Sequence, residues 1–169
     1  MRSSLLAVVL LAGSVSLPAI GDDTMVTLKP EQIGQIFCFS RLGNDEAVLD
    51  GILTAELKTA IADAWSKDEA YEKQYPGEKP PLGDGIPWQA WPDYAAECTI
   101  GLVTLMKTDA KVEINYTFPE DAAANFTDVL LLKRVDQPDY GTGFWRIDNI
   151  AYSTGGDLKA VLVGAFEDL

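Results

Sequence analysis

The stretch at residues 99–118, TIGLVTLMKTDAKVEINYTF, decides the fold. Its second half alternates apolar and polar side chains with period two, which is typical of a strand with one buried face. The apolar positions of that half are Val112, Ile114, Tyr116 and Phe118. Residues 99–106 form a more continuous apolar strand, and residues 107–109 suit a turn. The stretch therefore predicts an antiparallel hairpin with one face in a core.

Two more strands are predicted further along the chain, at residues 127–135 and 143–152. The segment between them, DQPDYG at 136–141, is rich in residues that favour turns. After Asp157, which suits an N-cap, apolar residues recur at helical spacing over residues 158–166. Four consecutive strands followed by a C-terminal helix are therefore expected.

Three helices are predicted before the sheet. Residues 30–42 carry apolar side chains at helical spacing, and residues 46–53 follow Asn44 and Asp45, which can cap a short helix. Thr54 can cap a longer amphipathic helix over residues 55–74. The predicted fold class is α+β, with N-terminal helices packed on a curved, cone-like antiparallel sheet of four strands.

The N-terminal segment at residues 1–21 has a basic start, a short apolar middle and small residues near its end. These features are typical of a signal peptide. The apolar run is too short to span a bilayer comfortably. We therefore expect residues 22–169 to form a single α+β domain that is periplasmic or secreted, without membrane insertion.

Composition excludes several function classes. The 169 residues include 13 Lys and Arg against 26 Asp and Glu, and no His. Without imidazole, Ser-His-Asp or Cys-His catalysis and His-ligated zinc are ruled out, and no acidic run has calcium-loop spacing, so we expect no metal and no cofactor. Removal of the leader would leave 12 basic and 26 acidic residues, a formal charge of -14. That charge disfavours nucleic acid and would hasten encounter with a basic protein or a small cation, but the simpler interpretation is that it only aids solubility.

Cys38 and Cys98 are the two cysteines of the chain. In an oxidising compartment the simplest prediction is one disulfide between them. Such a bridge closes a loop of about 60 residues and would stabilise the fold by roughly 4 kcal/mol through loss of chain entropy. A catalytic thiol is disfavoured, because Cys38 lies on an apolar helix face and no histidine could activate either sulfur.

Residues 144–152, FWRIDNIAY, followed by GGDLK at 155–159, resemble the nuclear transport factor 2-like superfamily, and within it exported bacterial families of unknown function. A last strand of the form W-R/K-I-D-x-I is common there. The resemblance covers the chain from about residue 26 onward. It implies a concave sheet face that holds a small molecule or a partner segment, and it allows a homodimer. The catalytic residues of the superfamily's enzymes find no matching motif, so none is transferred.

Asp148 and Arg146 are two residues apart on the last predicted strand, so alternation places them on the same side. A buried Asp148 could abstract a proton next to a carbonyl, with Tyr116 as the acid. The simpler interpretation is structural: Arg146 and Asp148 pair with each other or with a neighbouring strand.

Residues 75–94 contain five prolines and three glycines, so neither a helix nor a central strand can pass through them. Trp88, Trp91 and Tyr94 in this loop could cover the mouth of the cone or anchor a protein partner. The favoured alternative is that they pin the loop to the helices, because a small domain needs its apolar groups to close its core.

Together these observations favour an exported, non-enzymatic binding module for a small molecule or a protein partner. One alternative is an inhibitor or immunity-type protein that neutralises a basic exported enzyme. Another is a cofactor-free lyase or isomerase with Asp148 as its base. A cavity of about 300 Å³ or more, lined by Asp148 and aromatic residues, would support ligand binding or catalysis. A filled cone with an acidic, aromatic outer patch would support a protein partner.

Overall fold

The computed structural model describes residues 27–137 and 142–167. The predicted signal peptide, and most of the predicted turn at 136–141, lie outside these residues. The elements, in chain order, are α1 (Pro30–Arg41), η1 (Glu46–Ile52), α2 (Ala55–Gln74), β1 (Glu97–Leu105), β2 (Asp109–Thr117), η2 (Ala122–Ala124), β3 (Phe126–Gln137), β4 (Thr142–Ala151) and α3 (Leu158–Gly164). The predicted α+β class is confirmed. Within the described ranges, no helix is long and apolar enough to cross a membrane.

The sheet is an antiparallel meander with the order β1-β2-β3-β4. The predicted hairpin is present, and it pairs Val112 with Val103 and Tyr116 with Cys98. Val112, Ile114 and Tyr116 are all buried, so the alternation of β2 sets one face toward the core. Each strand begins and ends within two residues of its predicted bounds.

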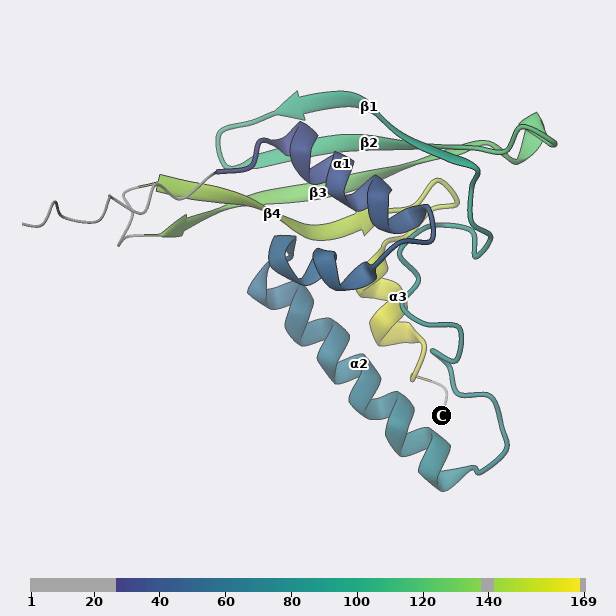
Figure 1. The fold of residues 1–169 in the computed structure, drawn as a ribbon. Coiled ribbons are helices and arrows are strands. Elements are labelled where there is room, and N and C mark those ends of the chain that lie inside the picture. Colours follow the sequence, from purple (N-terminus) through teal and green to yellow (C-terminus); the bar gives the residue numbers. More distant parts are fainter. Residues whose placement is uncertain (1–26, 138–141, 168–169) are drawn as a thin grey trace, which may run out of the picture.

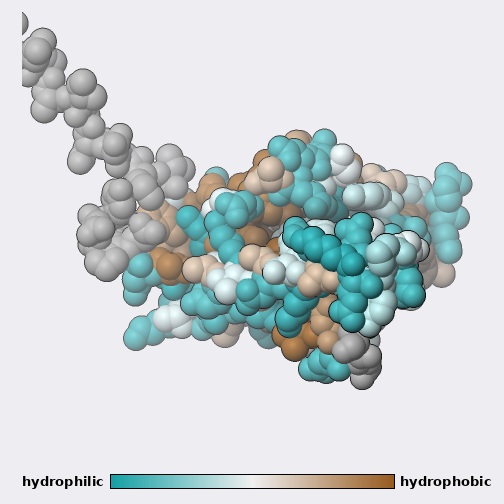
Figure 2. All heavy atoms as spheres, turned by 90° about the horizontal axis from the view of Figure 1, so that it is seen from below, coloured by the Kyte–Doolittle hydropathy of each residue, from teal (hydrophilic) through white to brown (hydrophobic). Residues whose placement is uncertain are grey.

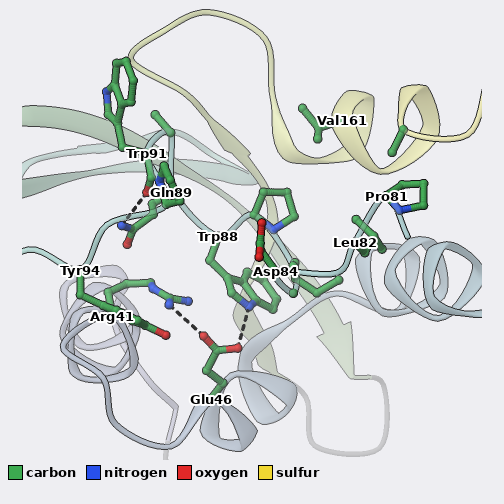
Figure 3. A pocket seen from close by; sticks show the side chains of 16 residues that line it. Arg41, Glu46, Pro81, Leu82, Asp84, Trp88, Gln89, Trp91, Tyr94 and Val161 are labelled. Carbon is green, nitrogen blue, oxygen red and sulfur yellow. Dashed lines mark hydrogen bonds and ion pairs between the residues drawn. The ribbon is translucent and has the colours of Figure 1, made fainter. Parts of the chain in front are cut away.

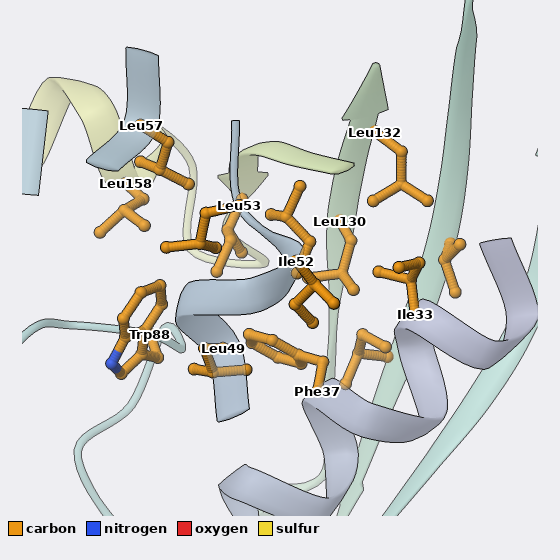
Figure 4. Packing of buried hydrophobic residues seen from close by; sticks show 14 of the residues in the cluster. Ile33, Phe37, Leu49, Ile52, Leu53, Leu57, Trp88, Leu130, Leu132 and Leu158 are labelled. Atoms are coloured by element: carbon orange, nitrogen blue, oxygen red, sulfur yellow. The ribbon is translucent and has the colours of Figure 1, made fainter. Parts of the chain in front are cut away.

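The helical elements lie on one side of this sheet, and α2 points away from the sheet (Figure 1). Ile33 and Phe37 of α1 face the sheet at the level of Leu130 and Leu132 of β3, with η1 beside them (Figure 4). All four side chains are almost completely buried. The covered face of the sheet is therefore filled by side chains.

Helix α1 lies very close to β1 and β2. A Cβ atom on Gly34 would come within 2.7 Å of a methyl group of Ile100 and 2.9 Å of one of Val112, so only glycine fits without displacement. One turn further along, the predicted disulfide between Cys38 and Cys98 joins α1 to β1, with the Cα atoms 5.2 Å apart. These contacts hold the end of α1 against the sheet.

The predicted caps are present at three helix starts. The side chains of Asp45, Thr54 and Asp157 accept backbone N–H groups at the beginnings of η1, α2 and α3, at 2.8, 3.2 and 2.9 Å. Each bond satisfies a donor that has no partner inside its helix. Local sequence therefore determines where these helices begin.

Strand β4 contains a bulge that simple alternation does not predict. Opposite Leu131 and Leu132 of β3, β4 places the three residues 147–149. As a result Ile147 and Ile150 are both fully buried although they are three positions apart. The extra residue in this register is Asp148, which interrupts the alternation of inward and outward side chains along β4.

Candidate functional site

The segment between α2 and β1 runs along one side of the molecule, past α3 and the end of α1 (Figure 1). Residues 75–96, which we call the Pro-rich segment, are all described and contain neither helix nor strand. Two buried carboxylates hold the segment: Asp68 of α2 accepts from the backbone of Leu82 at 2.7 Å, and Asp128 of β3 accepts from that of Ala90 at 2.9 Å. The segment is thus fixed in place and forms one wall of a recess.

That recess is a cleft of about 610 Å³ between the segment, the end of α1, η1 and α3. The lining residues that carry aromatic, charged or amide groups are Arg41, Glu46, Asp84, Trp88, Gln89, Trp91 and Tyr94 (Figure 3). Trp91 and Tyr94 are 52% and 60% exposed and form a rim, whereas Trp88 is buried. The three aromatic residues singled out in the sequence therefore line the same cleft.

A hydrogen-bonded chain in the cleft links Arg41 and Glu46 to Trp88, which lies 42 residues after Glu46 in the sequence. Arg41 Nη2 donates to Glu46 Oε1 at 2.8 Å, and Trp88 Nε1 donates to Glu46 Oε2 at 3.1 Å (Figure 3). The ring of Tyr94 lies against the guanidinium of Arg41, with 5.7 Å between Cζ and the ring centroid, which suits a cation–π contact. Glu46 thus connects α1 to the Pro-rich segment.

The cleft also holds polar atoms that lack partners. Arg41 is 4% exposed, yet its Nε and Nη1 find no hydrogen-bond partner in residues 27–137 and 142–167, which leaves three of its five N–H donors unmatched. Gln89 is 8% exposed; its Nε2 donates to two backbone carbonyls, but no described residue donates to its Oε1. Unmatched buried groups of this kind cost about 1–3 kcal/mol each. The cleft therefore has spare hydrogen-bonding capacity.

Asp148 lies outside the cleft, at the bulge of β4. Its Oδ2 accepts from Lys133 Nζ at 2.9 Å, and its Oδ1 accepts from Lys159 Nζ at 2.9 Å and from Thr54 Oγ1 at 3.0 Å. Burial raises the pKa of the Asp148 carboxyl, but the hydrogen bonds from Lys159, Lys133 and Thr54 outweigh burial and leave that pKa below its usual value. A carboxylate with a lowered pKa is a weak base, so the geometry is that of a structural junction.

Arg146 does not pair with Asp148. Its Nη1 donates to the backbone oxygen of Trp145 at 2.8 Å, and its guanidinium lies 5.5 Å from the ring centroid of Phe144. The alternation that would bring Arg146 and Asp148 together is interrupted by the bulge. Asp148 pairs instead with Lys133 on the neighbouring strand, which is the second of the two structural alternatives.

Tyr116 does not line the cleft either. Its ring stacks on Phe126 with 4.4 Å between the centroids, and the side chain is almost completely buried. Burial, together with the nearby Asp128 carboxylate, raises the pKa of the Tyr116 hydroxyl. That hydroxyl has no hydrogen-bond partner in the described part of the chain, and it remains protonated at neutral pH.

Two important residues escaped the sequence analysis although a signal for each is present. Arg41 follows Ile33 and Phe37 at intervals of four residues, so helical spacing places it on the buried face of α1. Asp128 likewise shares the inward face of β3 with Leu130, where a charged side chain is unusual. A charge at a core position is thus the pattern to look for.

Asp128 joins the Pro-rich segment to the turn before α3. Its oxygens accept from the backbone N–H groups of Ser153 at 2.8 Å and Ala90 at 2.9 Å. Burial raises the pKa of this carboxyl, and the bonds from Ser153 and Ala90 partly offset the effect. Glu46 and Gln89, by contrast, stand in no periodic pattern, so only the folded chain shows their roles.

Comparison with protein-family models, with curated proteins and with solved structures finds no match to this chain. The resemblance of residues 144–159 to the nuclear transport factor 2-like superfamily stays a prediction. Among the described residues, no group of three or more Cys, Asp and Glu could hold a metal ion. The site is therefore interpreted from its own geometry.

Proposed function

We propose that this protein is an exported, non-enzymatic binding module that holds a small organic molecule in the cleft beneath the Pro-rich segment. The observation that carries the proposal is the combination of aromatic walls with the buried side chains of Arg41 and Gln89, whose unmatched atoms lack partners within the described chain. Ligand sites typically combine largely apolar walls with a few converging polar groups in recesses of several hundred Å³. The cleft of about 610 Å³ has that size and combines aromatic with polar groups, although it lies beside the filled sheet face and is not lined by Asp148.

The contacts in the cleft favour holding a ligand over proton transfer. Both oxygens of Glu46 are engaged, by Arg41 and by Trp88, and Asp84 is paired with Lys79. Carboxylates that are held in ion pairs and hydrogen bonds of this kind are suited to positioning neighbouring groups. Asp148, the base of the lyase alternative, is held by two lysines away from the cleft.

Export is supported by the Cys38–Cys98 disulfide, because such bonds persist in oxidising compartments. The basic and apolar character of residues 1–21 supports it too. On the side of α2 and α3 the surface is mostly hydrophilic, with hydrophobic residues scattered over it (Figure 2). A periplasmic or secreted location accords with these features.

The exposed rim favours a second candidate function. Trp91 and Tyr94 are exposed on a protein with a formal charge of -13, a combination suited to an inhibitor that docks on a basic exported enzyme. Opposite charges at such an interface would make its affinity fall steeply as salt rises. A complex whose affinity does not change with salt would exclude this candidate.

The test of the first candidate uses the four tryptophans as reporters. The indole N–H signals of 15N-labelled protein are followed by NMR during titration with a library of aromatic fragments. We expect fragments to shift the signals of Trp88 and Trp91 saturably and to leave Trp145, which packs against the core from β4, unchanged. A Trp91→Ala variant should weaken the same fragments. A library that produces no saturable shift at Trp88 and Trp91 would overturn the proposal.

A further inference from the structure

We propose that the cleft recognises a carboxylate, so that its ligand is a carboxylic acid with an aromatic or otherwise apolar body. This inference rests on the proposed binding function and narrows it to one chemical class. The carboxylate would accept from the unmatched N–H groups of Arg41, and the body would lie against Trp88 and Trp91.

Arg41 is an incompletely satisfied buried cation. It gives one nitrogen to Glu46, while Nε and Nη1 meet no acceptor in the described residues. An ion pair taken out of water becomes favourable only when the remaining N–H groups also find acceptors. A carboxylate is the organic group that supplies both the negative charge and the lone pairs. A ligand of this class could therefore accept from the remaining N–H groups of the guanidinium while Glu46 keeps its own hydrogen bond.

The other charges of the cleft argue against a cationic or a neutral ligand. The oxygens of Glu46 are already bound to Arg41 and Trp88, and Asp84 is paired with Lys79. A cation would meet the Arg41 guanidinium and compete for carboxylates that are occupied. A neutral amide could also accept from Arg41, but it brings no negative charge to pair with the guanidinium, as a carboxylate does.

Tyr94 is the exposed neighbour of Arg41 that would move to admit the ligand. Its ring covers the guanidinium, yet the Tyr94 side chain itself is largely exposed. Displacement of this ring would uncover Arg41 without opening the core. The displaced ring would then be placed to pack against the apolar body of the ligand.

The acidity of the protein does not oppose this assignment at short range. The formal charge of -13 repels anions at a distance. At 0.15 M salt, however, exposed charges are screened beyond about 8 Å. Inside the cleft, the guanidinium of Arg41 is a buried charge with N–H groups that have no acceptor in the described residues.

The test compares three probes with the same ring: phenylacetate, phenylacetamide and phenethylamine, which are anionic, neutral and cationic. The Trp91 indole signal is titrated at pH 7 and 0.15 M NaCl. We expect phenylacetate to bind about tenfold more tightly than either of the others, because it alone brings a negative charge to pair with the guanidinium of Arg41. A preference for phenylacetamide or phenethylamine, or equal affinities, would overturn the carboxylate assignment while the binding function stands.

Two variants separate a direct role of Arg41 from general effects of charge. Glu46→Gln removes the negative charge next to Arg41 and keeps the side-chain volume, so phenylacetate should bind at least about threefold more tightly and should gain more than phenylacetamide does. Asp148→Asn removes a negative charge outside the cleft and should change neither affinity. Arg41→Gln should abolish the preference for phenylacetate.

Because Arg41→Gln could disturb folding, phenylacetate binding by Glu46→Gln and by the wild type is compared as an independent test of the carboxylate assignment. Weaker or unchanged phenylacetate binding in Glu46→Gln would contradict the assignment. If none of the three probes binds but neutral or cationic fragments do, the carboxylate inference alone fails. If no fragment of any charge shifts Trp88 or Trp91, the proposed function fails with it.

Discussion

Asp148 and Arg41 are both buried charges where secondary-structure elements meet, and they differ in how fully they are satisfied. Asp148, 8% exposed, binds two lysines and the hydroxyl of Thr54. Arg41 is buried more deeply and gives one nitrogen to Glu46, while two others have no partner in the described ranges. A buried charge with a complete set of partners stabilises a fold, whereas one with spare donors carries a penalty that a ligand can relieve.

The origins of the partners reinforce this contrast. Those of Asp148 come from β3, from the first turn of α3 and from the cap of α2, so one carboxylate holds three elements together. Thr54 serves twice, since its hydroxyl also accepts from Leu57 at the start of α2. Arg41 binds an acceptor only five residues along the chain, and two of its nitrogens are buried beside the cleft without a partner in the described residues. The first arrangement supports the fold, and the second supports recognition.

The largest effect is expected for Asp148→Ala. Loss of the carboxylate leaves Lys133, Lys159 and Thr54 without their acceptor, and we expect the free energy of unfolding to fall by about 2–3 kcal/mol in urea. This value is below that for a fully buried pair because solvent screens Lys133. Phenylacetate binding at 25 °C should be unchanged. Glu69→Ala, which breaks an exposed pair with Lys73, is the matched control and should not change stability measurably.

A smaller loss is expected for Trp88→Phe, which removes the N–H donor to Glu46 and part of a buried ring. We expect about 1–2 kcal/mol, from the hydrogen bond and the space left behind. Unlike Asp148→Ala, this variant should also weaken fragment binding, because Trp88 lines the cleft. A Trp65→Phe variant on α2, at a partly exposed side chain, serves as control. Unaltered fragment affinity in Trp88→Phe would contradict the distinction between a structural junction at Asp148 and a binding cleft at Trp88.

The pH dependence of stability tests whether the charge on Asp148 is what stabilises the fold. The folded-state pKa of Asp148 is below its unfolded value, so its contribution is fully present above about pH 4 and is lost as the pH falls through the folded pKa. Asp148→Asn should therefore be less stable than the wild type by about 1 kcal/mol at pH 7, and the difference should close below pH 4. Urea unfolding at several pH values measures this. A gap that persists at pH 2 would mean that charge is not the cause.

The smallest difference concerns the two lysines of the junction. The side chain of Lys159 is 30% exposed and that of Lys133 is 54% exposed, so solvent screens the Lys133 pair more strongly. Lys159→Met should cost about 0.5 kcal/mol more than Lys133→Met. Parallel thermal unfolding scans of both variants would show the order, and the reverse order would indicate that Lys133 carries the junction.

Local patterns in the sequence predicted most of the fold. The alternation of β2 and the bounds of α2 follow from the period of apolar residues, and the caps Asp45, Thr54 and Asp157 lie next to the helices that they begin. Each of these features depends on residues a few positions apart. The disulfide was predictable because the chain contains two cysteines.

The candidate site was predictable only in part. Trp88, Trp91 and Tyr94 stand out in the sequence, but the cleft needs α1 and η1 to meet a segment some 40 residues later. The bulge at Asp148 depends on the register of two strands, so alternation within β4 could not show it. Arg41 lay in a visible helical pattern, yet its unmatched donors appear only once its surroundings are folded.

The free energy of unfolding of Arg41→Met at pH 7, measured in urea against the wild type, tests the central claim most directly. Methionine replaces a buried cation that lacks acceptors, and the partner left behind, Glu46, is partly exposed. The stability of Arg41→Met should stay within about 1 kcal/mol of the wild type or rise. A loss of about 3 kcal/mol or more, as expected when a fully satisfied buried ion pair is broken, would contradict it.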